Sequence, residues 1–150
     1  MTYVPYAYKR VAPRRFVFTS VGMTEIKKVV EFIPLKAKNV VNLGFGDLLP
    51  DGSFDDEANS NNGDMLKVLT SVVYILKHYT SQHPKIMVFF TGSTKARTRL
   101  YTRIIRTYYS LFTKEFVLYG IIAADGDNET ILFDAQAELE YLAFLIKRIN

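Results

Sequence analysis

Residues 86–112 decide the fold, and they read IMVFFTGSTKARTRLYTRIIRTYYSLF. The first five of these residues are apolar without interruption, which is typical of a strand buried in the middle of a sheet. In the turn that follows, Gly92 allows a sharp change of direction, and Ser93 or Thr94 can cap a helix. A helix rich in lysine and arginine completes the segment. The sequence therefore predicts a strand, a tight turn and a long basic helix in direct succession.

The expected helix separates apolar from basic side chains. At about 100° per residue, one broad face carries Leu100, Tyr101, Ile104, Ile105, Tyr108, Leu111 and Phe112. The opposite face carries Lys95, Arg99, Arg103 and Arg106, together with Thr102. Arg97 falls on the apolar side. We therefore expect its guanidinium either to be buried in an ion pair or to line a cleft near the start of the helix.

Charge is distributed unevenly along the chain. Residues 94–114 hold six basic residues and no acidic one, although the whole chain carries a net charge of only +4. Residues 47–64 show the opposite bias, with six acidic residues and no basic one. A connection of this length is unusual in a compact domain. This acidic stretch offers a partner for the basic helix, either within the chain or from a second subunit.

The composition limits the class of protein. A length of 150 residues fits one domain, so we expect a single α+β domain over residues 1–150. Its 49% hydrophobic and 23% charged residues argue against disorder. The chain has no cysteine, which excludes disulfides and thiolate metal sites. Because there is neither a signal-peptide core nor an apolar run of about 20 residues, we expect a cytoplasmic protein without a membrane partner.

Hydrophobic periodicity gives the order of the elements. We expect residues 1–15 to be irregular or extended. Strands are expected at residues 15–21, 26–35, 39–45, 86–90, 116–123 and 130–133, and a buried helix from about Asp64 to about Gln82. Asp125 and Gly126 are strong turn formers and predict a hairpin between the last two of these strands. From periodicity alone, residues 141–149 suit either a helix or a strand.

Several blocks of the sequence resemble an uncharacterised bacterial family, a domain of unknown function common in the Bacteroidetes. The blocks are residues 26–30, 42–47, 60–64, 67–69 and 92–101, the last with the motif Gly-Ser-Thr-x-Ala-Arg-Thr-Arg-Leu-Tyr. Residues 143–148 resemble the family's usual ending, which favours a final strand. Lys95 stands where the family commonly has proline, a residue that suits the first turn of a helix. The resemblance implies no activity and no catalytic residues.

With that final strand, we expect a single mixed, mostly antiparallel sheet in the order β-β-β-α-β-α-β-β-β. Two helices should pack on one face of it. Gly92, Ser93, Thr94, Arg97 and Arg99 then form a candidate anion site, because N–H groups at a helix start, hydroxyls and guanidinia all bind phosphate or carboxylate. The spacing is not that of a P-loop. The alternative is a capped helix in which Arg97 forms an internal ion pair.

The basic face formed by Lys95, Arg99, Arg103 and Arg106 could follow a nucleic-acid backbone. We therefore predict a non-enzymatic module without a cofactor that binds nucleic acid or a nucleotide through residues 86–112. One alternative is an enzyme acting on phosphorylated or nucleic-acid substrates, with ribonuclease H-like topology and Asp47, Asp64 or Asp125 near Arg97. Another is a structural homo-oligomer.

No metal site is expected. The acidic stretch lacks the spacing of a calcium loop, and His78 and His83 do not share a helical face. The turn formers before the first helix are instead explained by helix capping through Asn62 or Asp64.

Overall fold

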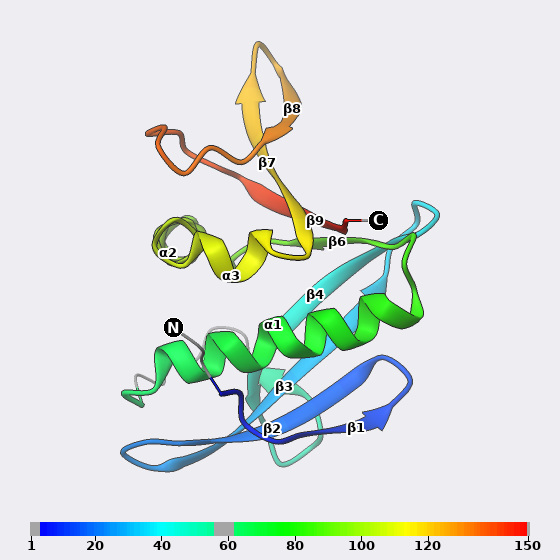
Figure 1. Cartoon of the computed structure of the whole chain (residues 1–150), viewed down its shortest axis with the longest axis vertical. Coiled ribbons are helices and arrows are strands. Elements are labelled where there is room, and N and C mark those ends of the chain that lie inside the picture. The colour runs from blue at the N-terminus through cyan, green and yellow to red at the C-terminus, as the bar shows by residue number, and fades with distance from the viewer. Residues whose placement is uncertain (1–3, 56–61, 150) are drawn as a thin grey trace. The chain divides into compact units, whose positions relative to one another are not determined.

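The computed structural model describes residues 4–55 and 62–149, and Figure 1 traces the chain. Outside the described residues lie the acidic residues Asp56 and Glu57. Ser60 and Asn61, from the block 60–64 that resembles the family, lie outside them as well. The elements are β1 (Tyr8–Ala12), β2 (Arg15–Val21), β3 (Glu25–Pro34), β4 (Val40–Leu48), β5 (Phe54–Asp55), α1 (Met65–Gln82), β6 (Met87–Phe90), α2 (Lys95–Thr107), α3 (Tyr109–Thr113), β7 (Phe116–Ala124), β8 (Asp127–Leu132) and β9 (Ala143–Arg148).

The strands hydrogen-bond in the order β1-β2-β3-β4-β6-β9-β7-β8, with β5 beside β4. The fold is thus α+β with one mixed, mostly antiparallel sheet, and the predicted order of strands and helices is confirmed. The chain divides into two compact units: Met1–Ile33 with Asn42–His83, and Pro34–Val41 with Pro84–Asn150. The beginning of β4 belongs to the second unit and the rest of that strand to the first.

In the first unit, aromatic side chains join the β2–β3 hairpin to α1. Phe16 of β2 is fully buried opposite Val30 of β3, and its ring meets that of Phe32 edge-on. The Phe32 ring stacks on that of Tyr79 from α1, with centroids 4.0 Å apart. Such contacts explain the wide apolar arc of the helix sequence. Met65, at the start of this helix, which was expected to be buried, is half-exposed.

The second unit is built around β9, which lies between β6 and β7 and runs antiparallel to both. The predicted hairpin is confirmed: Asp125 and Gly126 connect β7 to β8 with φ of 37° and 82°, as a tight hairpin turn requires. Gly120 of β7 accommodates the ring of Tyr141, because a Cβ there would lie 2.2 Å from Tyr141 Cδ1. This contact places the chain just before β9 against β7.

Residues 8–12, expected to be irregular or extended, are extended and form the edge strand β1, because their backbone pairs with β2. Two local expectations were wrong. The long basic helix ends at Thr107, and the short α3 follows after Tyr108 leaves helical geometry at φ −110°. Thr102, expected on the basic face, is buried. Its hydroxyl donates to the carbonyl oxygen of Thr98, which lowers the cost of burying it.

Candidate anion-binding site

The turn between β6 and α2 is held by hydrogen bonds to the first turn of the helix. Thr94, rather than Ser93, is the capping residue: its Oγ1 accepts a hydrogen bond from the N–H of Arg97 at 3.2 Å. Thr98 Oγ1 accepts from the N–H of Gly92 and donates to the carbonyl oxygen of Thr94, both at 3.1 Å. The two threonines thus fix the backbone of the turn relative to α2.

Gly92 is required here by close approach rather than by an unusual backbone angle. A Cβ at this position would lie 2.5 Å from the backbone N of Thr98 and 2.8 Å from the backbone carbon of Arg97. The turn therefore lies directly against the start of the helix. The N–H groups of Lys95 and Ala96, at the beginning of α2, have no carbonyl within the helix to bind.

A cavity of about 610 Å³ lies beside this turn. One wall is polar and includes Ser93, Thr94 and Lys95. Ile122 and Ala123 of β7 also line it, and so does a third segment, residues 139–142. The hydroxyl of Thr91 donates to the carbonyl oxygen of Leu142 at 2.8 Å and joins the end of β6 to that third segment. The volume lies within the range of small-molecule sites.

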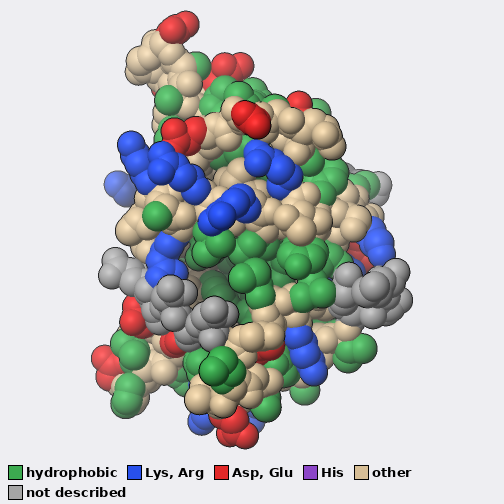
Figure 2. All heavy atoms as spheres, turned by 90° about the vertical axis from the view of Figure 1, so that its left-hand side faces the viewer, with side chains coloured by type: hydrophobic (Ala, Val, Ile, Leu, Met, Phe, Trp, Pro, Cys, Tyr) green, Lys and Arg blue, Asp and Glu red, His purple; other side chains and the backbone are tan. Residues whose placement is uncertain are grey.

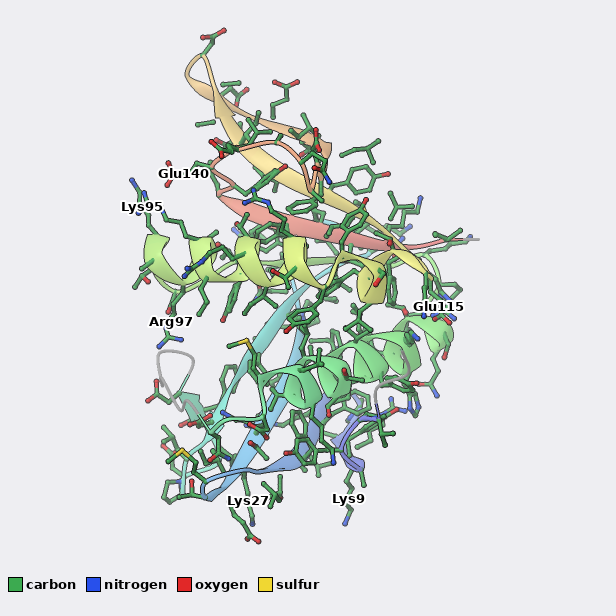
Figure 3. The ribbon with its side chains drawn as sticks, turned by 60° about the vertical axis from the view of Figure 1, so that its left-hand side comes forward. Lys9, Lys27, Lys95, Arg97, Glu115 and Glu140 are labelled. Carbon is green, nitrogen blue, oxygen red and sulfur yellow. The ribbon has the colours of Figure 1, made fainter. Side chains whose placement is uncertain are left out.

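The predicted anion-site residues are only partly gathered at this cavity. Gly92, Ser93 and Thr94 line it, and Lys95 lines it with them. Arg97 is half-buried and does not line it. Figure 3 shows that Lys95 leaves α2 on the side of Glu140, whereas Arg97 leaves it on the opposite side. Lys95 and Arg97, the first two basic residues of α2, thus lie on different sides of the helix.

The basic face of α2 contacts the segment that precedes β9. Arg99 donates from Nε and Nη2 to Oε1 of Glu140, at 3.0 and 2.7 Å, and Glu140 also lines the cavity. Arg106 donates to the carbonyl oxygen of Ala137 at 2.9 Å. Lys95 and Arg103 are exposed. In Figure 2, lysine and arginine side chains form a band over α2.

Glu140 and its neighbours were not identified from the sequence. The acidic stretch 47–64 was offered instead as the partner of the basic face. A signal was available. Residues 115–146 contain seven acidic residues and no basic one, directly after the basic helix. The apolar wall at Ile122 and Leu142 gave no comparable signal, because its residues are ordinary strand and loop residues whose proximity depends on the pairing of β7 with β9.

The expected capping of α1 by Asn62 or Asp64 was wrong, although Asp64 stands at the capping position. Asn62 is buried, its Oδ1 accepts from the N–H of Thr24 at 2.9 Å, and its Nδ2 donates to the carbonyl oxygen of Thr24 at 2.8 Å. Asp64 Oδ2 accepts from the hydroxyls of Tyr6 and Ser20, each at 2.5 Å. Both side chains therefore attach the β2–β3 hairpin to the start of α1.

These contacts also set the ionisation of Asp64. Partial burial alone would raise the pKa of its carboxyl group, but the hydrogen bonds from Ser20 and Tyr6 outweigh it, so the pKa is lowered below the ordinary value of 3.8. The pKa of Tyr6 is raised, first by burial and then by its bond to the Asp64 carboxylate. The charged carboxylate is therefore the form that the folded chain prefers.

The other carboxylates named in the enzyme alternative also have structural positions. Asp47 forms an ion pair with the buried Lys28, and Asp125 occupies the β7–β8 turn. Within residues 4–55 and 62–149, no group of three or more acidic or histidine side chains could hold a metal ion. The enzyme alternative remains a prediction.

The fold and the cavity define a small α+β protein with a cationic helix beside a partly polar hollow. The chain belongs to a family of unknown function, DUF6934, whose family model matches residues 2–149. This match confirms the resemblance to a family without an assigned function. No curated protein and no solved structure matches the chain. None of the helices in the described part of the chain is long and apolar enough to cross a membrane.

Proposed function

We propose that the protein is a non-enzymatic, cytoplasmic module of bacteria that binds an anionic partner, nucleic acid or a nucleotide, through residues 86–112. The observation that carries this proposal is the cavity beside the β6–α2 turn, which Lys95 lines together with Ser93 and Thr94. Residues that carry hydroxyl and ammonium groups thus line one cavity, and such groups bind phosphate oxygens.

Arg99 is not among the residues that line the cavity, but its ion pair with Glu140 leaves it able to bind an anionic partner. Their side chains are 63% and 57% exposed, and exposed pairs are worth only about 0–1 kcal/mol. A phosphate group can therefore replace Glu140 as the acceptor at little cost. With Lys95 and Arg103 also exposed, three cations of α2 are accessible to a partner.

The experiment is a titration of labelled single-stranded RNA of about ten nucleotides, and of AMP, with wild type and Arg99→Glu/Arg103→Glu. A matched control is Lys9→Glu/Lys27→Glu, which reverses two exposed charges on β1 and β3, far along the chain from the site. We expect at least one probe to bind. The α2 variant should bind it about tenfold more weakly or worse, and the control should bind like wild type.

Equal losses in the two double variants would mean that only net charge matters and would remove α2 from the proposal. Failure of wild type to bind either probe at low salt would reject the proposal as a whole. The homo-oligomer alternative has no observation that favours it over this one.

A further inference from the structure

Glu140 is an unexpected residue in a cavity offered to an anion. Both of its hydrogen bonds, the two from Arg99, fall on Oε1, and within the described residues Oε2 accepts none. A carboxylate beside the Ser93–Lys95 wall repels a bare anion. Glu140 Oε2 instead attracts a ligand that carries hydroxyl or amino donors, because a carboxylate oxygen accepts hydrogen bonds and donates none.

Another part of the cavity lining is apolar. Leu139 and Leu142 are 38% and 39% exposed, and both line the cavity with Ile122 of β7. Half-exposed leucines around a hollow of about 610 Å³ offer a surface on which a flat ring can pack. The cavity thus offers three chemistries: a cationic and hydroxyl-bearing wall, a carboxylate acceptor, and an apolar surface.

We propose that this cavity binds a phosphorylated small molecule of nucleotide size and that Glu140 determines its specificity. The phosphate lies against Ser93 and Lys95, sugar hydroxyls or an amino group donate to Glu140 Oε2, and the ring covers Leu139 and Leu142. This inference rests on the proposed function and deepens it. It specifies an anionic ligand that also carries hydrogen-bond donors. A site of this kind rejects analogues that lack the donors, since its polar group is then left without a partner.

The test compares two probes, AMP and inorganic phosphate, by isothermal titration calorimetry on the full chain. The variants are Glu140→Ala and, as a matched control, Glu138→Ala. The control removes an exposed carboxylate of the same segment that does not line the cavity. Wild type should bind AMP more tightly than phosphate. Glu140→Ala should weaken AMP about tenfold, as loss of a hydrogen bond to a charged group predicts.

The same variant should bind inorganic phosphate more tightly than wild type does, because a repelling carboxylate is gone and Arg99 is released. The opposite signs for the two probes are the decisive result, and Glu138→Ala should change neither affinity by more than about twofold. If Glu140→Ala binds both AMP and phosphate more tightly than wild type does, Glu140 only repels anions. That result would overturn the inference and leave the proposed function in place.

Binding of the RNA probe by wild type without binding of AMP would likewise overturn the inference and leave the proposed function in place. Absence of binding for RNA, AMP and phosphate alike would reject both. Circular dichroism and thermal unfolding of each variant ensure that a lost affinity is not a lost fold.

Discussion

Arg99 and Glu140 form an ion pair in which two guanidinium nitrogens donate to a single carboxylate oxygen, Oε1, at 3.0 and 2.7 Å. The pair joins α2 to the segment before β9 at the edge of the cavity, with more than half of each side chain exposed to solvent. The pair orients the guanidinium but holds it weakly, because solvent weakens the attraction and, within the described residues, Oε2 accepts no hydrogen bond.

This exposed pair contrasts with the ion pair of Lys28 and Asp47, whose lysine is 6% exposed. We expect Glu140→Ala to change the free energy of unfolding by less than about 1 kcal/mol. Lys28→Ala should lower it by about 3–5 kcal/mol, because it leaves the Asp47 carboxylate without its buried partner. Urea unfolding followed by circular dichroism measures both values. Equal effects in the two variants would contradict this ranking of the ion pairs.

The close approach of Gly92 to α2 predicts a cost for any side chain at that position. Gly92→Ala should lower the free energy of unfolding by about 1–3 kcal/mol, because the methyl group would meet the backbone N of Thr98 and must displace the turn. Ser93→Ala, one residue further along and exposed, is the control and should change stability by less than about 0.5 kcal/mol. A Gly92→Ala protein as stable as the control would show that the turn is not held against the helix.

The lowered pKa of Asp64 predicts how stability depends on pH. A carboxyl group whose pKa is lower in the folded chain than in the unfolded chain stabilises the fold above its ordinary value of 3.8, and this contribution is lost as the pH falls through the lowered value. Asp64→Asn should therefore be less stable than wild type at pH 7, by a margin that stays constant down to about pH 5 and narrows below about pH 4.

Tyr6→Phe is the companion variant, because it removes one of the two hydroxyls that donate to the Asp64 carboxylate. It should raise the pKa of Asp64 toward the ordinary value, measured by NMR titration of the carboxyl carbon. An unchanged pKa in Tyr6→Phe, or a stability margin that widens in acid, would contradict the assigned cause.

Much of the fold was predictable because its signals are local. The apolar run of β6, the wide apolar arc of α1 and the Asp125–Gly126 turn each reflect a single segment, and the structure has all three. The end of the basic helix at Thr107 was not predictable from periodicity, because the apolar pattern continues through α3 without a proline or glycine.

The site was less predictable because its partners come from distant segments. The turn at Gly92 and the cap at Thr94 follow from the residue types alone. That Arg99 would pair with Glu140, 41 residues away, depends on where β9 places the chain before it. The role of Asn62 was missed for the same reason: a turn former beside a helix suggests a cap, and only the packing of the β2–β3 hairpin shows what it binds.

The most direct test of the central claim is the salt dependence of phosphate-probe binding in wild type and in Lys95→Gln/Arg103→Gln. We predict that the affinity of wild type for the RNA probe falls steeply between low and moderate salt. The variant should show a slope of log affinity against log salt that is smaller by about 0.7 for each phosphate contact removed. Identical slopes for the two proteins, or an affinity that does not change with salt, would contradict the assignment of residues 86–112 as an anion-binding unit.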